Sequence, residues 1–274
     1  DYFYPTNVLV TGYDIIFFWV AKMIFSSFEM MNKAPFEHVL IHGLVRDSQG
    51  RKMSKSLGNG IDPLQIIEQY GADALRFSLM LGNSPGNDLR FFTEKVEASR
   101  NFANKIWNAA RFVHMNIDNE NIEASLPSEL EPIDRWILSR LNKVTQEVSS
   151  NIDKFELGIA AQKLYDFIWD EFCDWYIEFS KISGKKEVLL WVMTNLLKLL
   201  HPFMPFVTEE IWCSFPHEGD SVMISDYPVC SKAHIDEKAE KEVELLISVI
   251  KSVRNLRREM NVPHGKKTMI YIEI

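Results

Sequence analysis

The run NVLVTGYDIIFFWVAKMIFSSFE at residues 7–29, followed by HVLIHGLV at residues 38–45, decides the fold of the N-terminal part. Asn7–Thr11 is a short β-prone run that stops at Gly12, and Asp14–Glu29 is an apolar stretch of helical length. The second run is again rich in β-prone residues. The order strand, turn, helix and strand predicts an α/β beginning.

A polar loop and two short helices follow. Residues 46–60 hold Ser, Lys, Gln, Asn and Gly without an apolar period, which predicts a loop. Asp62 followed by Pro63 has the pattern of an N-cap and a first helical residue, and Gly71 fits the end of that helix. A second short helix is predicted over residues 72–81.

Past the turn residues of 83–88 strand signals become rare, so we place a domain boundary near residue 93. From Glu94 onward apolar residues recur at helical spacing, which predicts an all-α bundle. Pro205 has the position of a helix start. The helices are expected within residues 96–113, 137–148, 157–181, 187–201, 205–215 and 237–260.

Two later segments have other patterns. Val222–Tyr227 predicts a small extended excursion, and Thr268–Ile274 alternates like a strand. The expected fold class is therefore mainly α with an α/β N-terminal part. We divide the chain into residues 1–93, a helical bundle at 94–260, and the start of a small truncated α/β extension at 261–274.

The composition is that of an ordinary globular protein, with 46% hydrophobic and 25% charged residues among 274, a length that favours two domains. The net charge of −8 excludes a polycation that binds nucleic acid by bulk charge, so a nucleic-acid partner must meet a local patch. Cys173, Cys213 and Cys230 are too few and too widely spaced for a disulfide framework or a CxxC metal pair. A reducing cytosol fits this cysteine usage.

No stretch reaches the roughly 18 uninterrupted apolar residues of a membrane span, so no membrane partner is expected. The chain opens with Asp1 and lacks a basic region followed by an apolar one, the pattern of a secretory signal. We therefore expect an excised piece of a longer cytoplasmic protein.

The pentapeptide Lys52-Met53-Ser54-Lys55-Ser56 carries the clearest chemistry. It lies in the predicted loop after a β-rich run, with Gly50 before it and Gly58 and Gly60 after it. Two ammonium groups and two hydroxyls on such a loop can close over a polyphosphate and offset its charge. A generic loop rich in Lys and Ser is more often a solvated turn, but the full pentapeptide is far rarer than a generic pattern.

These five residues match the KMSKS signature of the class I aminoacyl-tRNA synthetases letter for letter. The chain resembles the valyl family of that class over essentially its whole length, in the family's order and spacing. The resemblance implies the second half of a class I Rossmann-like catalytic domain, followed by an anticodon-binding bundle. It is carried by Asn7–Trp19, Leu40–Pro63, GADALRF at 71–77 and NFANKIWNAARF at 101–112.

The resemblance also implies an adenylate site. Gly12 would permit close approach of the backbone to the nucleotide, and Asp14 would accept hydrogen bonds from ribose hydroxyls. The residues alone leave open an Asp14 that only stabilises a helix N-terminus. His42 and Gly43 match positions on the adenine and phosphate side, and His42 alone could equally be a core histidine.

Three further roles follow from the resemblance. The backbone of Val45 would read the adenine, and Met53 would pack near the same ring. Trp19 would form an aromatic wall for the aliphatic side chain of the amino acid, although an aromatic in the run FFW is on sequence alone more often packing.

In the family, ATP and the amino acid give an aminoacyl-adenylate and pyrophosphate, and the aminoacyl group then passes to tRNA. Lys52 and Lys55 would be the catalytic groups that hold the leaving pyrophosphate, assisted by Ser54 and Ser56. ATP with Mg²⁺ is the expected nucleotide, and no protein-bound metal is expected because no ligand cluster is visible.

The second signature of the class, HxGH, does not occur in the sequence. We therefore expect half an active site and a chain that is inactive alone. The expected partners are valine, ATP and tRNA(Val), without DNA. An isoleucyl or leucyl relative remains an alternative, because a pocket separates one methylene by only ~1–3 kcal/mol. An RNA-binding module without catalysis is a second one, whereas a P-loop enzyme is excluded because GxxxxGK(S/T) is absent.

Residues 251–267 carry a net charge of +5 in this acidic chain. Lys251, Arg254 and Arg258 share one helical face by their i, i+3 and i+7 spacing, and such a face can contact RNA phosphates. A solvated helix face is the alternative.

Asp134-Arg135-Trp136 has a position typical of the family's anticodon bundle. The tryptophans of the helical region are expected to be core and helix contacts rather than platforms for base stacking. They are Trp107, Trp136, Trp169, Trp175, Trp191 and Trp212.

Overall fold

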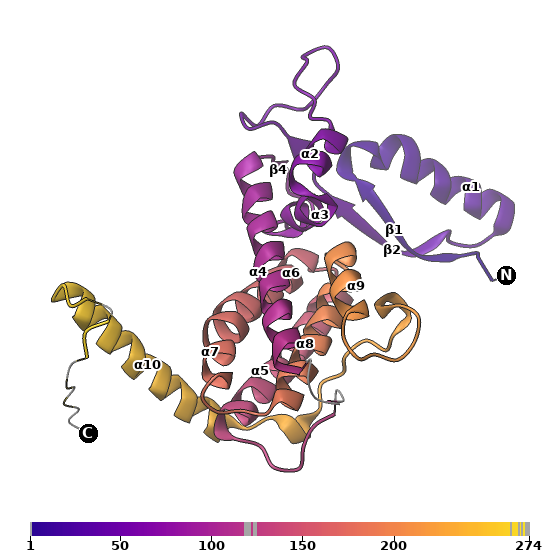
Figure 1. The fold of residues 1–274 in the computed structure, drawn as a ribbon. Helices are drawn as coiled ribbons and strands as arrows, with labels where there is room; N and C mark the ends of the chain where they lie inside the picture. The colour runs from indigo at the N-terminus through magenta and orange to yellow at the C-terminus, as the bar shows by residue number, and fades with distance from the viewer. Residues whose placement is uncertain are drawn as a thin grey trace.

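The computed structural model describes residues 2–117, 122, 125–263, 265–267, 269 and 271. An N-terminal α/β part sits at one end of a helical bundle, and a last long helix projects away from the other end (Figure 1). The predicted fold class, mainly α with an α/β beginning, is confirmed.

The first strands form a parallel pair. β1 (Thr6–Gly12) lies beside β2 (Phe36–His42), and Gly12 is opposite His42. The connection runs through a 3-10 turn and a π-helical segment, η1 and η2 (residues 13–20), into helix α1 (Ala21–Met31). The predicted order of strand, turn, helix and strand is confirmed, although the helix opens with irregular turns.

The predicted strand at 38–45 is divided. β2 ends at His42, and the chain resumes as β3 (Val45–Arg46), which pairs in parallel with β4 (Leu89–Arg90). Between β3 and β4 lie the polar loop and two helices, α2 (Pro63–Tyr70) and α3 (Ala72–Met80).

The helix signals read from the sequence act as expected. Asp62 caps α2 by accepting a hydrogen bond from the backbone N–H of Leu64 at 2.9 Å, and Pro63 is the first helical residue. Gly71 ends α2 at a φ of +90°, a backbone conformation that residues other than glycine rarely adopt.

From residue 93 the described residues form helices and turns. α4, α10 and α5 are the longest helices of this region, and the largest buried side chains of the bundle include Trp136, Tyr176 and Trp212. The helices predicted for this region are confirmed, and the segment predicted at 157–181 consists of α6, a π-helical segment η3 and α7. The bounds are α4 (Thr93–Ile117), α5 (Pro132–Asp153), α6 (Leu157–Asp166), η3 (Phe167–Tyr176), α7 (Ile177–Ser180), α8 (Lys186–Leu200), α9 (Pro205–Cys213) and α10 (Glu237–Glu259).

Helix α4 takes part in two hydrophobic clusters. Near its start, Val96 is fully buried in what we call the α2–α3 cluster, and from Phe102 onward the helix contributes to the bundle core. The buried members of the α2–α3 cluster are Ile66, Ala74, Leu75, Phe91 and Val96. Because α4 is shared, the division at residue 93 stays a prediction.

Helix α3 is fastened to the bundle by polar and aromatic contacts from the stretch GADALRF. Asp73 is buried and accepts hydrogen bonds from the backbone N–H groups of Phe206 and Val207, at the start of α9. Arg76 donates to the Pro202 carbonyl at 3.1 Å. Phe77, fully buried, stacks on Phe102 of α4 with ring centres 5.0 Å apart. We call this set the α3 joint.

The predicted extended excursion at Val222–Tyr227 is wrong. Residues Val222–Ile224 form a 3-10 turn, capped by the hydroxyl of Ser221, which accepts from the N–H of Met223 at 3.1 Å. Val222 is buried, whereas the next two apolar residues are exposed, so one side chain anchors the turn and no strand face forms. The strand predicted at Thr268–Ile274 lies mostly outside the described residues.

Helix α10 touches the bundle mainly with its first turns, where Ala239, Glu240 and Val243 are buried. Ile247 and Ile250 farther along still pack against the bundle core, and the last turns project into solvent (Figure 1). Among the described residues, none of the helices combines the length and apolar character that crossing a bilayer requires.

Most of the tryptophans of the helical region are core or helix contacts, as predicted. Trp136, Trp175 and Trp212 are buried, and Trp169 and Trp191 pack against the bundle core. Trp107 differs, because 42% of it is exposed.

Candidate active site

The carboxyl ends of β1 and β2 meet at one edge because the two strands are parallel. A Cβ built on Gly12 would lie 2.9 Å from Asp14 Oδ1 and 3.6 Å from His42 Cε1. The absence of a side chain at Gly12 therefore allows these two residues to come close. Open α/β sheets bind ligands at such strand ends.

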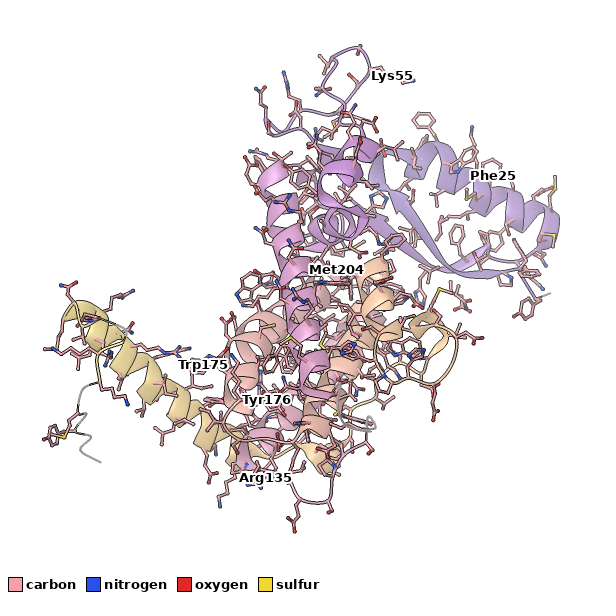
Figure 2. The ribbon with its side chains drawn as sticks, in the orientation of Figure 1. Phe25, Lys55, Arg135, Trp175, Tyr176 and Met204 are labelled. Carbon is pink, nitrogen blue, oxygen red and sulfur yellow. The ribbon has the colours of Figure 1, made fainter. Side chains whose placement is uncertain are left out.

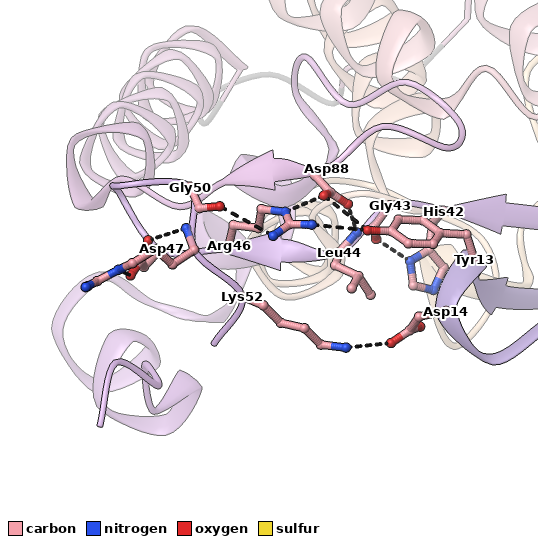
Figure 3. Close-up of polar contacts among 11 residues, drawn as sticks. Tyr13, Asp14, His42, Gly43, Leu44, Arg46, Asp47, Gly50, Lys52 and Asp88 are labelled. Carbon is pink, nitrogen blue, oxygen red and sulfur yellow. Dashed lines mark hydrogen bonds and ion pairs between the residues drawn. The ribbon is translucent and has the colours of Figure 1, made fainter. Parts of the chain in front are cut away.

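The first lysine of the pentapeptide reaches the same edge. Lys52 Nζ lies 3.1 Å from Asp14 Oδ2 (Figure 3), and residues Arg46 and Lys52 form an antiparallel bridge. The Lys52 side chain is 62% exposed. An exposed pair of this kind contributes only ~0–1 kcal/mol, so a polyphosphate can replace the carboxylate as the partner of the lysine.

Gly43 is required by a close backbone approach. A Cβ at this position would lie 1.9 Å from the Asn87 carbonyl oxygen, so any side chain would push the turn at 83–88 away. His42, Gly43, Val45 and Asn87 are among the residues that line a cleft of about 240 Å³. His42 Nδ1 is 2.7 Å from the Gly43 carbonyl oxygen.

Asp88 holds this edge together. Its carboxylate accepts hydrogen bonds from the Leu44 N–H at 2.7 Å and the Tyr13 hydroxyl at 3.2 Å, and it forms an ion pair with Arg46 (Figure 3). Arg46 also donates to the Gly50 carbonyl. The Leu44 amide is the main cause that lowers the pKa of Asp88, and the Arg46 guanidinium acts in the same direction.

We call residues 52–56 the KMSKS loop. After Lys52 this loop extends away from the sheet. Lys55 lies at its tip (Figure 2). Ser54 Oγ is 3.1 Å from Ser56 Oγ and accepts from the Leu57 N–H at 3.3 Å. Met53 is partly buried against the α2–α3 cluster. The structure thus brings Lys52 to the strand ends and leaves Lys55 apart from them.

Trp19 lies on η2, shortly after the end of β1. It is 60% exposed, and Phe17 and Phe18 beside it are more exposed still. The structure does not bring Trp19 into the cleft that His42, Gly43 and Val45 line.

The basic face predicted on the last helix is directed partly toward the bundle. Lys251 Nζ and the Arg254 guanidinium lie 5.8 and 5.3 Å from the ring centre of Trp175, whose side chain is almost wholly buried (Figure 2). These are cation–π distances. Arg258 lies one turn farther along the exposed part of α10.

Asp134, Arg135 and Trp136 have structural contacts. Asp134 is fully buried, burial raises the pKa of its carboxyl group, and it accepts a hydrogen bond from Tyr176 at 2.8 Å. Arg135 pairs with Asp236, the N-cap of α10, at 3.2 Å. Trp136 lies in the core. The three residues attach α5 to its neighbours.

Within the ranges that the structure describes, no three His, Cys, Asp or Glu side chains are grouped so as to hold a metal ion.

Two models of known protein families match this chain. A family model described as "tRNA synthetases class I (I, L, M and V)" matches residues 1–92, and one described as "Anticodon-binding domain of tRNA ligase" matches residues 134–272. The chain belongs to the class I tRNA synthetases. The resemblance found in the sequence is confirmed.

Curated relatives of this class are valine–tRNA ligases. That of Clostridium tetani is 56% identical over 99% of this chain, and that of Geobacillus stearothermophilus is 53% identical over 99%. The match covers 32% of each relative, so the chain spans about a third of their length.

Solved structures of class I synthetases share the fold. Agrobacterium radiobacter LeuRS, in a ternary complex with tRNA and LeuAMS, superposes with a TM-score of 0.75 over 85% of this chain and 29% of its own, at 21% identity. Mycobacterium tuberculosis methionyl-tRNA synthetase bound to methionyl-adenylate gives 0.60 over 76% of this chain and 43% of its own, at 23% identity.

Sequence reasoning missed several polar residues of this candidate site. Tyr13, Arg46 and Asp88 fix the strand ends, and Asp47 and Asn59 bond to the loop. The available signal was their position, because Asp and Asn next to turns and loops commonly accept hydrogen bonds from nearby backbone.

Proposed function

We propose that this chain supplies the KMSKS half of the catalytic domain and the anticodon-binding bundle of a valine–tRNA ligase. The whole enzyme would activate valine with ATP to give valyl-adenylate and pyrophosphate, and then transfer the valyl group to tRNA(Val) in the cytoplasm. The observation that carries the proposal is the position of Lys52, which meets Asp14 at the strand ends beside Gly12 and His42. The choice of valine rests on the relatives at 53–56% identity.

In the first step a carboxylate oxygen of valine attacks the α-phosphorus of ATP, which arrives with Mg²⁺. The new P–O bond gives valyl-adenylate, and the bond to the β-phosphate oxygen breaks to release pyrophosphate. Lys52 and Lys55 would stabilise the charge that develops on this leaving group, and Ser54 and Ser56 would add hydrogen bonds.

The nucleoside would lie against the strand ends. Asp14 accepts hydrogen bonds from the ribose hydroxyls in this proposal, and the glycine at position 12 leaves room for the sugar. His42, Gly43 and Val45 would contact the adenine side. When ribose engages Asp14, Lys52 loses its partner and becomes free to pair with phosphate.

Trp19 would contact the side chain of valine, and Met53 would support the adenine from the loop. Trp19 is exposed and Met53 packs on the α2–α3 cluster. Both roles therefore require the nucleotide-bound form of the enzyme and rest on the family's pattern.

The sequence contains no HxGH, so we propose that the chain alone does not form adenylate at a useful rate. A second candidate activity for the chain by itself is tRNA binding. The match of residues 134–272 to an anticodon-binding domain favours it.

The test of catalysis is valine-dependent exchange of pyrophosphate into ATP in the full-length ligase that carries this chain. Lys52→Ala and Lys55→Ala should lower kcat strongly while the KM for valine changes little. An equal loss in both parameters would contradict the assignment of the lysines to pyrophosphate. Faster exchange with isoleucine or leucine would overturn the choice of valine.

The test of tRNA binding uses the 274-residue chain with tRNA(Val) and a non-cognate tRNA at two salt concentrations. Changing Lys251, Arg254 and Arg258 together to Ala should reduce the salt slope by about 2–3 if each contacts a phosphate. An unchanged slope would assign the face to packing on Trp175 instead.

A further inference from the structure

We propose that Asp47 and Asn59 form a clamp that fixes the base of the KMSKS loop and leaves its tip free, so that Lys52 is a stationary cation and Lys55 a mobile one. The proposal deepens the proposed function and rests on it for the identity of the substrate. The clamp itself is argued from contacts within the chain.

Asn59 bonds to the backbone on both sides of Met53. Its Oδ1 accepts a hydrogen bond from the Ser54 N–H at 3.0 Å, and its Nδ2 donates to the Lys52 carbonyl at 3.3 Å. One amide side chain therefore sets the direction in which the chain leaves Lys52. A carboxylate of the same shape could keep only the first of these bonds.

Asp47 holds the Asn59 side chain in place by a hydrogen bond. Its Oδ2 accepts from Asn59 Nδ2 at 2.9 Å and from Arg51 Nε at 2.8 Å, and its Oδ1 accepts from the Arg51 N–H at 2.8 Å and the Gln49 N–H at 3.1 Å. The residue is only 7% exposed. It thus closes the turn before Lys52 and links that turn to the segment after the loop.

The ionised form of Asp47 matches these four donors. The hydrogen bond from Asn59 is the main cause that lowers the pKa of Asp47 to about 2, with Arg51 acting in the same direction. The carboxylate is therefore charged at neutral pH, and its interaction with the Asn59 amide is a charge-assisted hydrogen bond.

The tip has a different set of contacts. Gly58 donates its N–H to the Lys55 carbonyl at 3.3 Å, and the two serine hydroxyls bond to each other. These contacts lie within residues 54–58. Residues 55–58 can therefore move about Ser54 without breaking the clamp, while Lys52 stays at the strand ends.

The division gives the two lysines different tasks. A cation held in place before the reaction stabilises developing charge without reorganisation, which is the more effective electrostatic arrangement. A second cation on a closing tip adds charge only when the polyphosphate is present. Asp47 and Asn59 are positioning residues here, since they act through the backbone of Lys52 and Ser54.

The experiment compares Asn59→Asp, Asn59→Ala and Asp47→Asn with Gln49→Ala, a control whose exposed side chain lies on the same turn outside the clamp. In the 274-residue chain, hydrogen exchange at the Ser54 amide and trypsin cleavage after Lys52 should both increase for Asn59→Ala. Asn59→Asp should mainly increase the cleavage, because it retains the acceptor for the Ser54 amide. The control should match the wild type in both measurements.

In the full-length ligase the clamp variants should lower kcat of pyrophosphate exchange roughly 10- to 100-fold, the cost of a small misplacement, with the KM for valine unchanged. The double change Asp47→Asn with Asn59→Asp exchanges donor and acceptor and should recover part of the loss. Two residues that act independently of each other would not show this reciprocal rescue.

Unchanged hydrogen exchange at the Ser54 amide and unchanged trypsin cleavage in Asn59→Ala would overturn the clamp, whatever the activity of the ligase. Loosened loops with normal kcat would show that the clamp does not position Lys52. A wild-type ligase without valine-dependent exchange would refute the proposed function but not the clamp, because the loop measurements do not need substrate. If Asn59→Ala does not fold, Asp47→Asn gives the same comparison.

Discussion

Replacing Asp73 by Ala should loosen the α3 joint. The buried carboxylate accepts from the Val207 N–H at 2.6 Å and the Phe206 N–H at 3.2 Å. It therefore caps α9 from another helix, since the N-cap residue of α9 is Met204, which offers no side-chain cap. Alanine would leave two backbone N–H groups of a helix start without this acceptor.

The size of the effect follows from these two bonds. A hydrogen bond to a charged group contributes ~1.5–3 kcal/mol, and loss of a helix cap costs ~0.5–2 kcal/mol. Because the two bonds share one carboxylate, we expect Asp73→Ala to lower the free energy of unfolding by about 2–4 kcal/mol. At roughly 2–4 °C per kcal/mol for a chain of about this size, Tm should fall by about 4–16 °C.

Thermal unfolding followed by circular dichroism measures this change. Asp62→Ala is a matched control, because Asp62 is also an N-cap but an exposed one that serves its own helix with a bond to the Leu64 N–H. It should cost ~1 kcal/mol. If Asp73→Ala is no more damaging than this control, the packing of Phe77 on Phe102 holds the α3 joint and the reasoning about the cap is refuted.

Three further predictions concern single sites. Gly43→Ala should destabilise the protein by about 1–3 kcal/mol in urea unfolding, because its Cβ would meet the Asn87 carbonyl; a neutral result would mean that the turn can shift freely. The pKa of Asp47 is lowered to about 2 from an ordinary 3.8, so its contribution to loop stability is present above about pH 4 and lost toward pH 2. The difference in proteolysis between wild type and Asp47→Asn should therefore vanish as pH falls through this range, and a constant difference would contradict the ionised clamp. Burial raises the pKa of Cys173 to about 12, so iodoacetamide should modify it more slowly than the exposed Cys213 when peptides are followed by mass spectrometry; equal rates would show that the core opens.

The local part of the fold could be predicted from the sequence. Asp62 before Pro63 fixed the start of α2, and Pro205 fixed the start of α9, because both signals act within one helical turn. The segment 222–227 misled the prediction, since the burial of Val222 and the Ser221 cap favour a turn, and the burial depends on packing against other helices. The cap that Asp73 provides could not be predicted, because more than 130 residues separate it from its partners.

The candidate site divides in the same way. The lysines and serines of the loop were found because their spacing is a motif, and Gly12 and His42 were found because they match positions of the family that this motif identifies. Asp88 and Asn59 were missed, since an isolated Asp or Asn in a turn has many possible local partners. The distinction between Lys52 at the strand ends and Lys55 at the tip depends on the folded structure, because the sequence presents the two as equivalent.

Helix α4 has 25 residues, so at 1.5 Å per residue it is about 37 Å long. Its first turns fill the cluster beneath the KMSKS loop and its later turns fill the bundle core. Losing or gaining one residue between these two regions would shift the bundle by about 1.5 Å and rotate it by about 100° against the strand ends. Evolution can therefore vary the exposed side chains of α4 but not its length, and insertions in proteins of this kind should accumulate in the loops on either side of it.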